Sequence, residues 1–176
     1  MAKTEGDLVR LSLDEVRTLA TESLVHHGAS IEQAQAVAET ITSAERDGCK
    51  SHGLFRLPGY IGSLKSGKIT GDAVPVVSEL APAVVKVDAA NGFSSLPLDM
   101  GTAALAEKAR EMGIAALAIT NSYHFAALWP GAQPALHQLS HRAAFPCRRR
   151  CGGLWRLAGY AGSRQADLAL SSCALL

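Results

Sequence analysis

The sequence has none of the short motifs that most often identify a nucleotide-binding or hydrolytic enzyme. No G-x-G-x-x-G follows an expected strand, so a Rossmann dinucleotide site has no support, and Walker, nucleophile-elbow and zincin motifs are also missing. No run of eighteen apolar residues occurs, so we expect no membrane span. Residues 1–10 carry four charged side chains and no apolar segment, which argues against a signal peptide.

Cysteine is scarce over most of the chain. Cys49 is the only cysteine before Pro130, which argues against a disulfide scaffold and indicates a reducing, cytoplasmic location. No neighbouring group in the sequence clearly activates the Cys49 thiol, so we expect a buried packing residue rather than a nucleophile.

Acidic residues and lysine are scarce in the last part of the chain. Residues 1–129 hold 11 Lys and Arg against 15 Asp and Glu, whereas residues 130–176 hold six Arg, no Lys and one Asp. This composition is typical of a GC-rich gene read out of frame. We therefore hypothesise that residues 131–176 are a frameshifted, poorly ordered tail, which reading the coding DNA across Leu128 to Gln138 in all three frames would test.

The same tail has two other interpretations. Four possible zinc ligands occur as His137-x-x-x-His141 and Cys147-x-x-x-Cys151, but the spacing of the cysteines is unusual and we predict no metal site. Three consecutive arginines could bind phosphates, yet no interleaved aromatic residues support a nucleic-acid module, and we expect no nucleic-acid partner. A non-catalytic interaction module whose Arg-rich tail binds acidic partners is kept as an alternative.

Helical signals dominate the chain up to about Thr70. Capping boxes at Ser12–Glu15 and Ser30–Gln33 open two amphipathic patterns, which we expect to end at Gly28 and at about Arg46. The short connection between them predicts an antiparallel pair. A third helix is expected from about His52 to Lys65.

Strand signals follow the helices. The β-branched runs at residues 74–77 and 83–88 and the continuous apolar run at 114–120 are expected strands, and a helix is expected over 96–112. Pro75 lies in the first run and argues for an edge position. The fold class is therefore α/β, with an N-terminal helical segment that leads into a sheet.

One short stretch carries most of the reactive side chains. Histidine exchanges protons near neutral pH, so His52 is a candidate acid or base, and the preceding Ser51 can hydrogen-bond it. Arg56 follows about one helical turn later, and its planar guanidinium suits a substrate carboxylate. A proton donor beside a carboxylate clamp is what reduction of a 2-oxo or 2-imino acid requires.

A second group of polar residues follows the last expected strand. Thr120, Asn121, Ser122 and His124 lie where the chain leaves the buried run at residues 114–120. Ligands bind preferentially at the carboxyl ends of strands in α/β sheets, so this loop is a candidate binding site. A solvated strand-end loop is the structural alternative.

Together, these two stretches resemble the type-2 malate/L-lactate dehydrogenase family of NAD(P)-dependent oxidoreductases. The matching residues are Asp47, Ser51-His52-Gly53, Arg56, Leu57, Tyr60, Gly67-Lys68-Ile69, Asn121, His124-Phe125 and Leu128-Trp129. The wording C-x-S-H-G-L-F-R-L and H-F-A-A-L-W-P is most similar to the Δ1-piperideine-2-carboxylate/Δ1-pyrroline-2-carboxylate reductase branch. The resemblance covers about Leu11 to Pro130, and the chain from about residue 131 does not match.

The resemblance implies a fold and a division of the chain. It implies a non-Rossmann mixed sheet, truncated here, with residues 1–70 as an N-terminal helical region and residues 71–130 as the first part of an NAD(P)-binding α/β domain. The full-length form is expected to be a homodimer. The family's second half also supplies an Asp that partners the Ser-His pair, and this Asp cannot be placed here, so we expect impaired activity.

The resemblance also implies a reaction and the residues that perform it. The expected reaction is NADPH- or NADH-dependent reduction of small cyclic 2-imino acids or 2-oxo acids, with malate, lactate or ureidoglycolate dehydrogenation as the alternative. Ser51 and His52 are implied as catalytic and Arg56 as substrate-binding. The residues implied in cofactor binding are His52, Arg56, Thr120, Asn121, Ser122 and His124.

Overall fold

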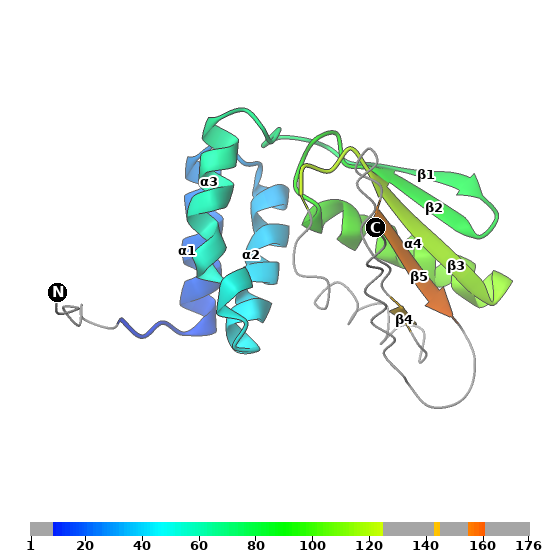
Figure 1. The fold of residues 1–176 in the computed structure, drawn as a ribbon, viewed down its shortest axis with the longest axis horizontal. Coiled ribbons are helices and arrows are strands. Elements are labelled where there is room, and N and C mark those ends of the chain that lie inside the picture. Colours follow the sequence, from blue (N-terminus) through cyan, green and yellow to red (C-terminus); the bar gives the residue numbers. More distant parts are fainter. Residues whose placement is uncertain (1–8, 125–142, 145–154, 161–176) are drawn as a thin grey trace, which may run out of the picture.

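The computed structural model describes residues 9–124, 143–144 and 155–160. Its elements in chain order are α1 (Leu13–His26), α2 (Ile31–Arg46), the 3-10 turns η1 (Lys50–His52) and η2 (Leu54–Arg56), α3 (Leu57–Lys65), β1 (Val76–Ala81), β2 (Val84–Asp88), α4 (Ser95–Met112), β3 (Ile114–Thr120), β4 (Ala143–Ala144) and β5 (Trp155–Tyr160). Helices α1, α2 and α3 lie together on one side of the molecule, and the sheet lies on the other (Figure 1). In the described part of the chain, no helix is long and apolar enough to cross a bilayer.

The first two helices begin at the expected serines, but only one capping box is complete. The Ser12 hydroxyl accepts from the Glu15 N–H at 3.2 Å, and the Glu15 carboxylate accepts from the Ser12 N–H at 2.7 Å. Ser30 likewise accepts from the Gln33 N–H at 3.3 Å. The Gln33 side chain, however, turns into the core and donates to the Ala73 carbonyl at 2.8 Å. The return bond from the Gln33 side chain to the Ser30 backbone, which completes a capping box, is therefore not formed, and this half of the prediction is wrong. The buried Ala73 carbonyl needs a donor more than the half-buried cap does.

The sheet is mixed, which confirms the predicted fold class. Its strand order is β1-β2-β3-β5-β4; β2 and β3 are parallel, and the other neighbouring pairs are antiparallel. β1 lies at the edge, as Pro75 predicted. It covers Val76–Ala81 rather than 74–77, because pairing with β2 sets its length and Pro75 has no N–H to donate.

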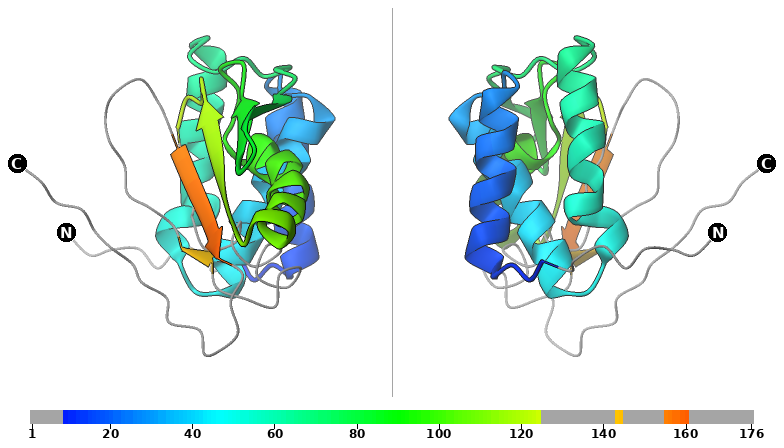
Figure 2. Two further views of the ribbon diagram at one scale, coloured as in Figure 1. Left: turned by 90° about the vertical axis from the view of Figure 1, so that its right-hand side faces the viewer. Right: turned by 90° about the vertical axis from the view of Figure 1, so that its left-hand side faces the viewer.

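Helix α4 connects the two parallel strands and covers one face of the sheet (Figure 2). The apolar side chains that β2 and β3 direct to this face are buried against the helix. Gly101 allows the close approach, because a Cβ there would lie 2.6 Å from Leu117 Cδ1 and 3.0 Å from Val87 Cγ2. Gly113 ends the helix in the left-handed conformation, with φ of 77°.

We expect Gly101→Ala to destabilise the protein by about 1–3 kcal/mol, because the new methyl group would overpack the interface between α4 and the sheet. Alanine would otherwise favour a helix over glycine by about 1 kcal/mol. Gly62 in α3 is the matched control, since a Cβ there meets nothing within 4 Å and Gly62→Ala should be stabilising. Urea denaturation of both variants measures the difference. Equal shifts in the same direction would contradict this packing.

One aromatic side chain connects the helices to the sheet. Phe93 follows β2 but is completely buried in the hydrophobic cluster of α1, α2 and α3. A separate cluster holds α4 on β2 and β3. The division of the chain at residues 70 and 130 stays a prediction, and most of the predicted tail lies outside the described residues.

Candidate active site

The reactive stretch does not form the single helix predicted over His52–Lys65. It forms two 3-10 turns, η1 and η2, before α3 begins. Gly53 separates them with non-helical angles of φ −86° and ψ −143°, and the Leu54 N–H donates to the Glu45 carboxylate at 2.7 Å. A Cβ at Gly53 would collide with this same carboxylate. Pro58 lies in the first turn of α3, where a proline is tolerated.

Ser51 and His52 form the predicted pair. The Ser51 hydroxyl lies 3.1 Å from Nδ1 of His52, within hydrogen-bond distance. Ser51 is exposed and His52 is half-buried, so the pair lies near the surface of η1. A hydrogen bond at one ring nitrogen sets the orientation and tautomer of an imidazole. The geometry is therefore that of an oriented proton donor or acceptor.

Cys49 is exposed, so its predicted burial is wrong. It follows Gly48, whose φ of +71° turns the chain sharply at the end of α2, and it precedes η1 on the surface. Within the described ranges, no group of three or more His, Cys, Asp or Glu could hold a metal ion. The four possible zinc ligands of the tail lie outside the described residues.

Arg56 and Tyr60 connect the reactive stretch to the core. Arg56 ends η2 and is exposed, whereas Tyr60 lies one turn later in α3 and is buried. Burial raises the pKa of the Tyr60 hydroxyl, and the nearby positive charge of Arg56 partly opposes that rise. The Arg56 guanidinium is therefore accessible to a ligand.

The carboxyl ends of β2 and β3 meet in two hydrogen-bonded loops. The Ala89 N–H donates to the Thr120 carbonyl at 2.8 Å, and the Asn91 N–H donates to the Asn121 carbonyl at 2.7 Å. Positive φ angles at Ala90 (48°), Asn91 (62°) and Asn121 (51°) mark sharp turns at these strand ends. Positive φ is unusual for alanine, and such conformations are concentrated at functional sites.

Asp88 fixes the relative position of the two loops. Its carboxylate accepts from the Ala90 N–H at 2.9 Å and from the Asn121 side-chain amide at 2.8 Å. These hydrogen bonds hold the pKa of Asp88 below its usual value. The Asn121 side chain is thus engaged by the protein itself, and Ser122 similarly donates to the His124 carbonyl at 2.9 Å.

His124 projects from the β3 loop into an aromatic cluster. Its ring lies edge-on to Tyr60 with centroids 4.8 Å apart, and Phe93 lies 5.6 Å away. Both ring nitrogens are buried without a hydrogen-bond partner among the described residues, as is the hydroxyl of Thr120. Burial, and then the positive charge of Arg56, lower the pKa of His124 to about 4. The imidazole is therefore neutral at physiological pH.

The structure thus places the rings of Tyr60 and His124 in contact, and Arg56 lies one helical turn before Tyr60. Tyr60 is among the residues that resemble the family, but no role was predicted for it. Phe93 and Asp88 were not predicted as site residues. Asp88 could have been found, because it ends the expected strand at 83–88, and the ends of parallel strands meet at one edge of a sheet.

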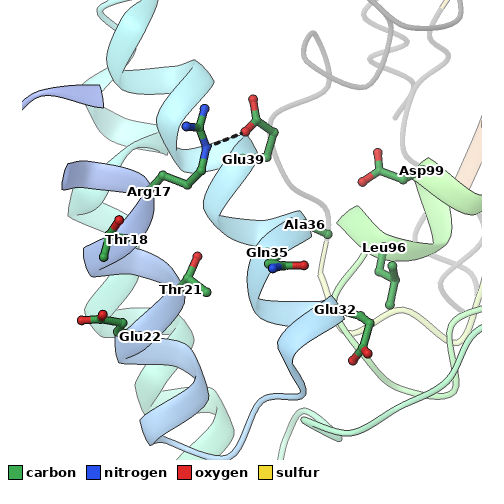
Figure 3. Close-up of a pocket in the computed structure, with 10 residues that line it drawn as sticks. All are labelled: Arg17, Thr18, Thr21, Glu22, Glu32, Gln35, Ala36, Glu39, Leu96 and Asp99. Atoms are coloured by element: carbon green, nitrogen blue, oxygen red, sulfur yellow. Dashed lines mark hydrogen bonds and ion pairs between the residues drawn. The ribbon is translucent and has the colours of Figure 1, made fainter. Parts of the chain in front are cut away.

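A cavity of about 740 Å³ lies elsewhere, between α1, α2 and the start of α4 (Figure 3). Arg17 donates to the Glu39 carboxylate across it at 3.0 Å. Asp99 retains contact with solvent, yet desolvation by the surrounding protein and the charge of Glu39 raise its pKa to about 6. None of the predicted site residues lines this cavity, so its size alone does not identify the active site.

Comparison with known proteins gives a consistent family assignment. The family model described as malate/L-lactate dehydrogenase matches residues 11–139, which extends beyond Pro130. The Δ1-pyrroline-2-carboxylate reductase of Ancylobacter novellus is 51% identical over 128 residues, which cover 73% of this chain and 38% of that protein. The Δ1-pyrroline-2-carboxylate/Δ1-piperideine-2-carboxylate reductase of Pseudomonas aeruginosa is 48% identical over 122 residues, or 69% of this chain and 36% of that protein.

Solved structures agree with this assignment. The Δ1-piperideine-2-carboxylate reductase of Pseudomonas syringae pv. tomato matches with a TM-score of 0.71 and 46% identity, over 75% of this chain and 40% of that chain. The malate dehydrogenase of Entamoeba histolytica matches with a TM-score of 0.67 and 26% identity, over 73% and 36%. The chain spans about two fifths of the length of these relatives, and it belongs to the malate/L-lactate dehydrogenase family.

Proposed function

We propose that this chain is part of an NAD(P)H-dependent reductase of small cyclic 2-imino acids or 2-oxo acids. The observation that supports this most directly is the combination of an oriented Ser51–His52 pair, 3.1 Å apart, with the accessible guanidinium of Arg56. The relatives named for Δ1-pyrroline-2-carboxylate and Δ1-piperideine-2-carboxylate reduction support the same substrate class.

In the proposed reaction, each side chain has a separate task. Arg56 binds the substrate carboxylate, because a guanidinium can donate to both of its oxygens at once. A nicotinamide cofactor, when bound, would supply the hydride that reduces the imine or carbonyl carbon. His52, oriented by Ser51, donates the accompanying proton to the nitrogen or oxygen as negative charge develops there. The product is then a cyclic amino acid or a 2-hydroxy acid.

The strand-end loops fit a polar cofactor. Thr120 has a buried hydroxyl, and His124 two buried ring nitrogens, without hydrogen-bond partners among the described residues. Buried polar groups are rarely left unsatisfied, so a ligand with donors and acceptors would complete them. Asn121 and Ser122 would instead shape the loop, because their side chains already bond to the protein. NADPH and NADH both fit this description.

The rest of the proposal concerns the whole protein. Oxidation of malate, lactate or ureidoglycolate is the second candidate, which the structural match to a malate dehydrogenase favours. We further propose a cytoplasmic homodimer for the full-length form. A site completed by later segments accords with the share of the relatives' length that this chain covers.

Thermal unfolding with and without the cofactor tests the proposal on the chain itself. NADPH at 100 times its Kd should raise the free energy of unfolding by about 2.7 kcal/mol. Arg56→Gln should weaken the additional protection given by a 2-oxo acid such as pyruvate. No protection by NADPH or NADH, together with salt-sensitive binding to a polyanion such as heparin, would instead support a non-catalytic interaction module.

A further inference from the structure

The end of helix α2 contacts the two turns that carry the reactive side chains. The Glu45 carboxylate accepts from the Leu54 N–H at 2.7 Å. This hydrogen bond lies at the junction between η1, which carries Ser51 and His52, and η2, which carries Arg56. We propose that Glu45 is a positioning residue, which fixes this junction and thereby the place of His52 relative to Arg56. Its role in a reduction rests on the proposed function, whereas its role in placing η1 does not.

The two turns need support from other parts of the protein. Each is a single 3-10 turn, and such turns have poor hydrogen-bond geometry and little stability of their own. No side chain among the described residues caps η1 or η2, and η1 contains no buried residue. The contacts at the two ends of η1 therefore have a large share in its position.

Both ends of η1 are held by the end of α2. Before η1, the Cys49 N–H donates to the Ala44 carbonyl at 2.8 Å. After η1, the Leu54 N–H donates to the carboxylate of Glu45, the next residue of α2. A hydrogen bond to a charged acceptor is about twice as strong as one between neutral groups. Glu45 therefore supplies the stronger of these two contacts.

The turn η2 has further support from the core. The Leu54 side chain packs against the hydrophobic cluster of α1, α2 and α3. η2 also runs directly into α3, whose buried side chains anchor it. Loss of the Glu45 carboxylate should therefore release η1 more than η2. His52 would then move while Arg56 stays in place, so the geometry between proton donor and carboxylate clamp would no longer be fixed.

Gly53 makes room for the Glu45 carboxylate. It is buried between the two turns, and a Cβ there would lie 2.5 Å from Glu45 Cδ and 2.9 Å from Glu45 Cγ. These atoms belong to the end of a flexible side chain, so the methyl group in Gly53→Ala should displace the carboxylate rather than the backbone. We therefore expect Gly53→Ala to act by breaking the hydrogen bond between Glu45 and Leu54.

NMR of this chain tests the placement of η1 without an activity assay. Glu45→Ala should speed exchange of the Leu54 amide proton by about tenfold or more, and should lower the order parameters of the Ser51 and His52 amides from about 0.85 toward 0.6. The amides of α3 should keep their order, which separates a loss of position from unfolding. Unchanged order parameters for Ser51 and His52 in this variant would overturn the proposal.

Glu32→Ala is the matched control for Glu45→Ala. Glu32 is exposed in the first turn of α2, at the opposite end of the same helix. The substitution removes the same atoms, so exchange at Leu54 and the order of η1 should stay as in the unsubstituted chain. Equal loss of η1 order in both variants would show that the effect does not come from the contact between Glu45 and Leu54.

Two further variants keep the test decisive if Glu45→Ala unfolds the chain. Glu45→Gln keeps an acceptor oxygen at the same reach, so the order of η1 should be retained. Gly53→Ala should reproduce the losses of Glu45→Ala, and the double variant should lose no more than either single one, because both changes remove the same hydrogen bond. Additive losses would overturn the joint role of Gly53 and Glu45. An η1 as disordered in Glu45→Gln as in Glu45→Ala would overturn the role of the hydrogen bond.

Protection by NADPH or NADH, measured in parallel, separates this inference from the proposed function. Protection of the unsubstituted chain, with an η1 that stays ordered in Glu45→Ala, would leave the reductase in place and overturn the positioning role. Release of η1 in Glu45→Ala, without protection by either nucleotide, would confirm that Glu45 places η1 and would contradict its role in a reduction.

Discussion

Phe93→Ala is expected to destabilise the protein by about 3–5 kcal/mol, which is a large part of the stability of a typical domain. The Phe93 side chain is fully buried and fills the space between α1, α2 and α3. It also lies 5.6 Å from the rings of both Tyr60 and His124. Its removal leaves a cavity at the point where the helices meet the strand-end loops. Urea denaturation followed by circular dichroism measures the loss.

Phe55 provides the matched control for this substitution. It lies in η2 and is 78% exposed, so Phe55→Ala removes the same atoms from water rather than from a core. We expect a change within about 0.5 kcal/mol, as for most surface substitutions. Similar losses in both variants would show that Phe93 does not join the helices to the sheet.

His52→Ala is expected to lower kcat by about 10²–10⁴-fold, the usual contribution of a positioned general acid. The measurement needs a complete enzyme, for which we suggest a chimera that joins residues 11–124 of this chain to the remaining part of the Pseudomonas syringae reductase. Ser51→Ala should cause a smaller loss, because it removes only the hydrogen bond that orients the imidazole. The fold should remain intact in both variants, since neither side chain belongs to the core.

The control for the chimera is His26→Ala. His26 is exposed in the last turn of α1, so its loss should leave kcat unchanged. A dependence of kcat on pH that disappears in His52→Ala would further support proton donation. Turnover by His52→Ala at the rate of the unsubstituted chimera would remove His52 from the mechanism.

Local signals predicted much of the fold. The caps at Ser12 and Ser30 and the buried run at residues 114–120 act over a few residues, and their elements formed as expected. The family resemblance identified the type of sheet, which no local pattern could specify.

Contacts between distant residues account for what the sequence did not show. Glu45 divides the expected third helix by accepting from Leu54, and Gln33 leaves its capping box to satisfy the distant carbonyl of Ala73. At the site, the sequence showed which reactive side chains are present, but it did not show that Tyr60 packs against His124. This contact depends on how α3 packs against the loop after β3. Because the two segments are far apart in the sequence, no short sequence pattern encodes it.

The crossover between the two parallel strands has a consequence for the order of folding. α1 and α2 are joined by a short turn, so their contacts can form as soon as both helices have left the ribosome. β2 has no such local partner on its other side, since Val84 pairs with Ala116, which follows only after the whole of α4. Closure of this long loop must precede the pairing. The contacts between α1 and α2 should therefore form first, during translation, and the half of the site on the strand ends should appear last.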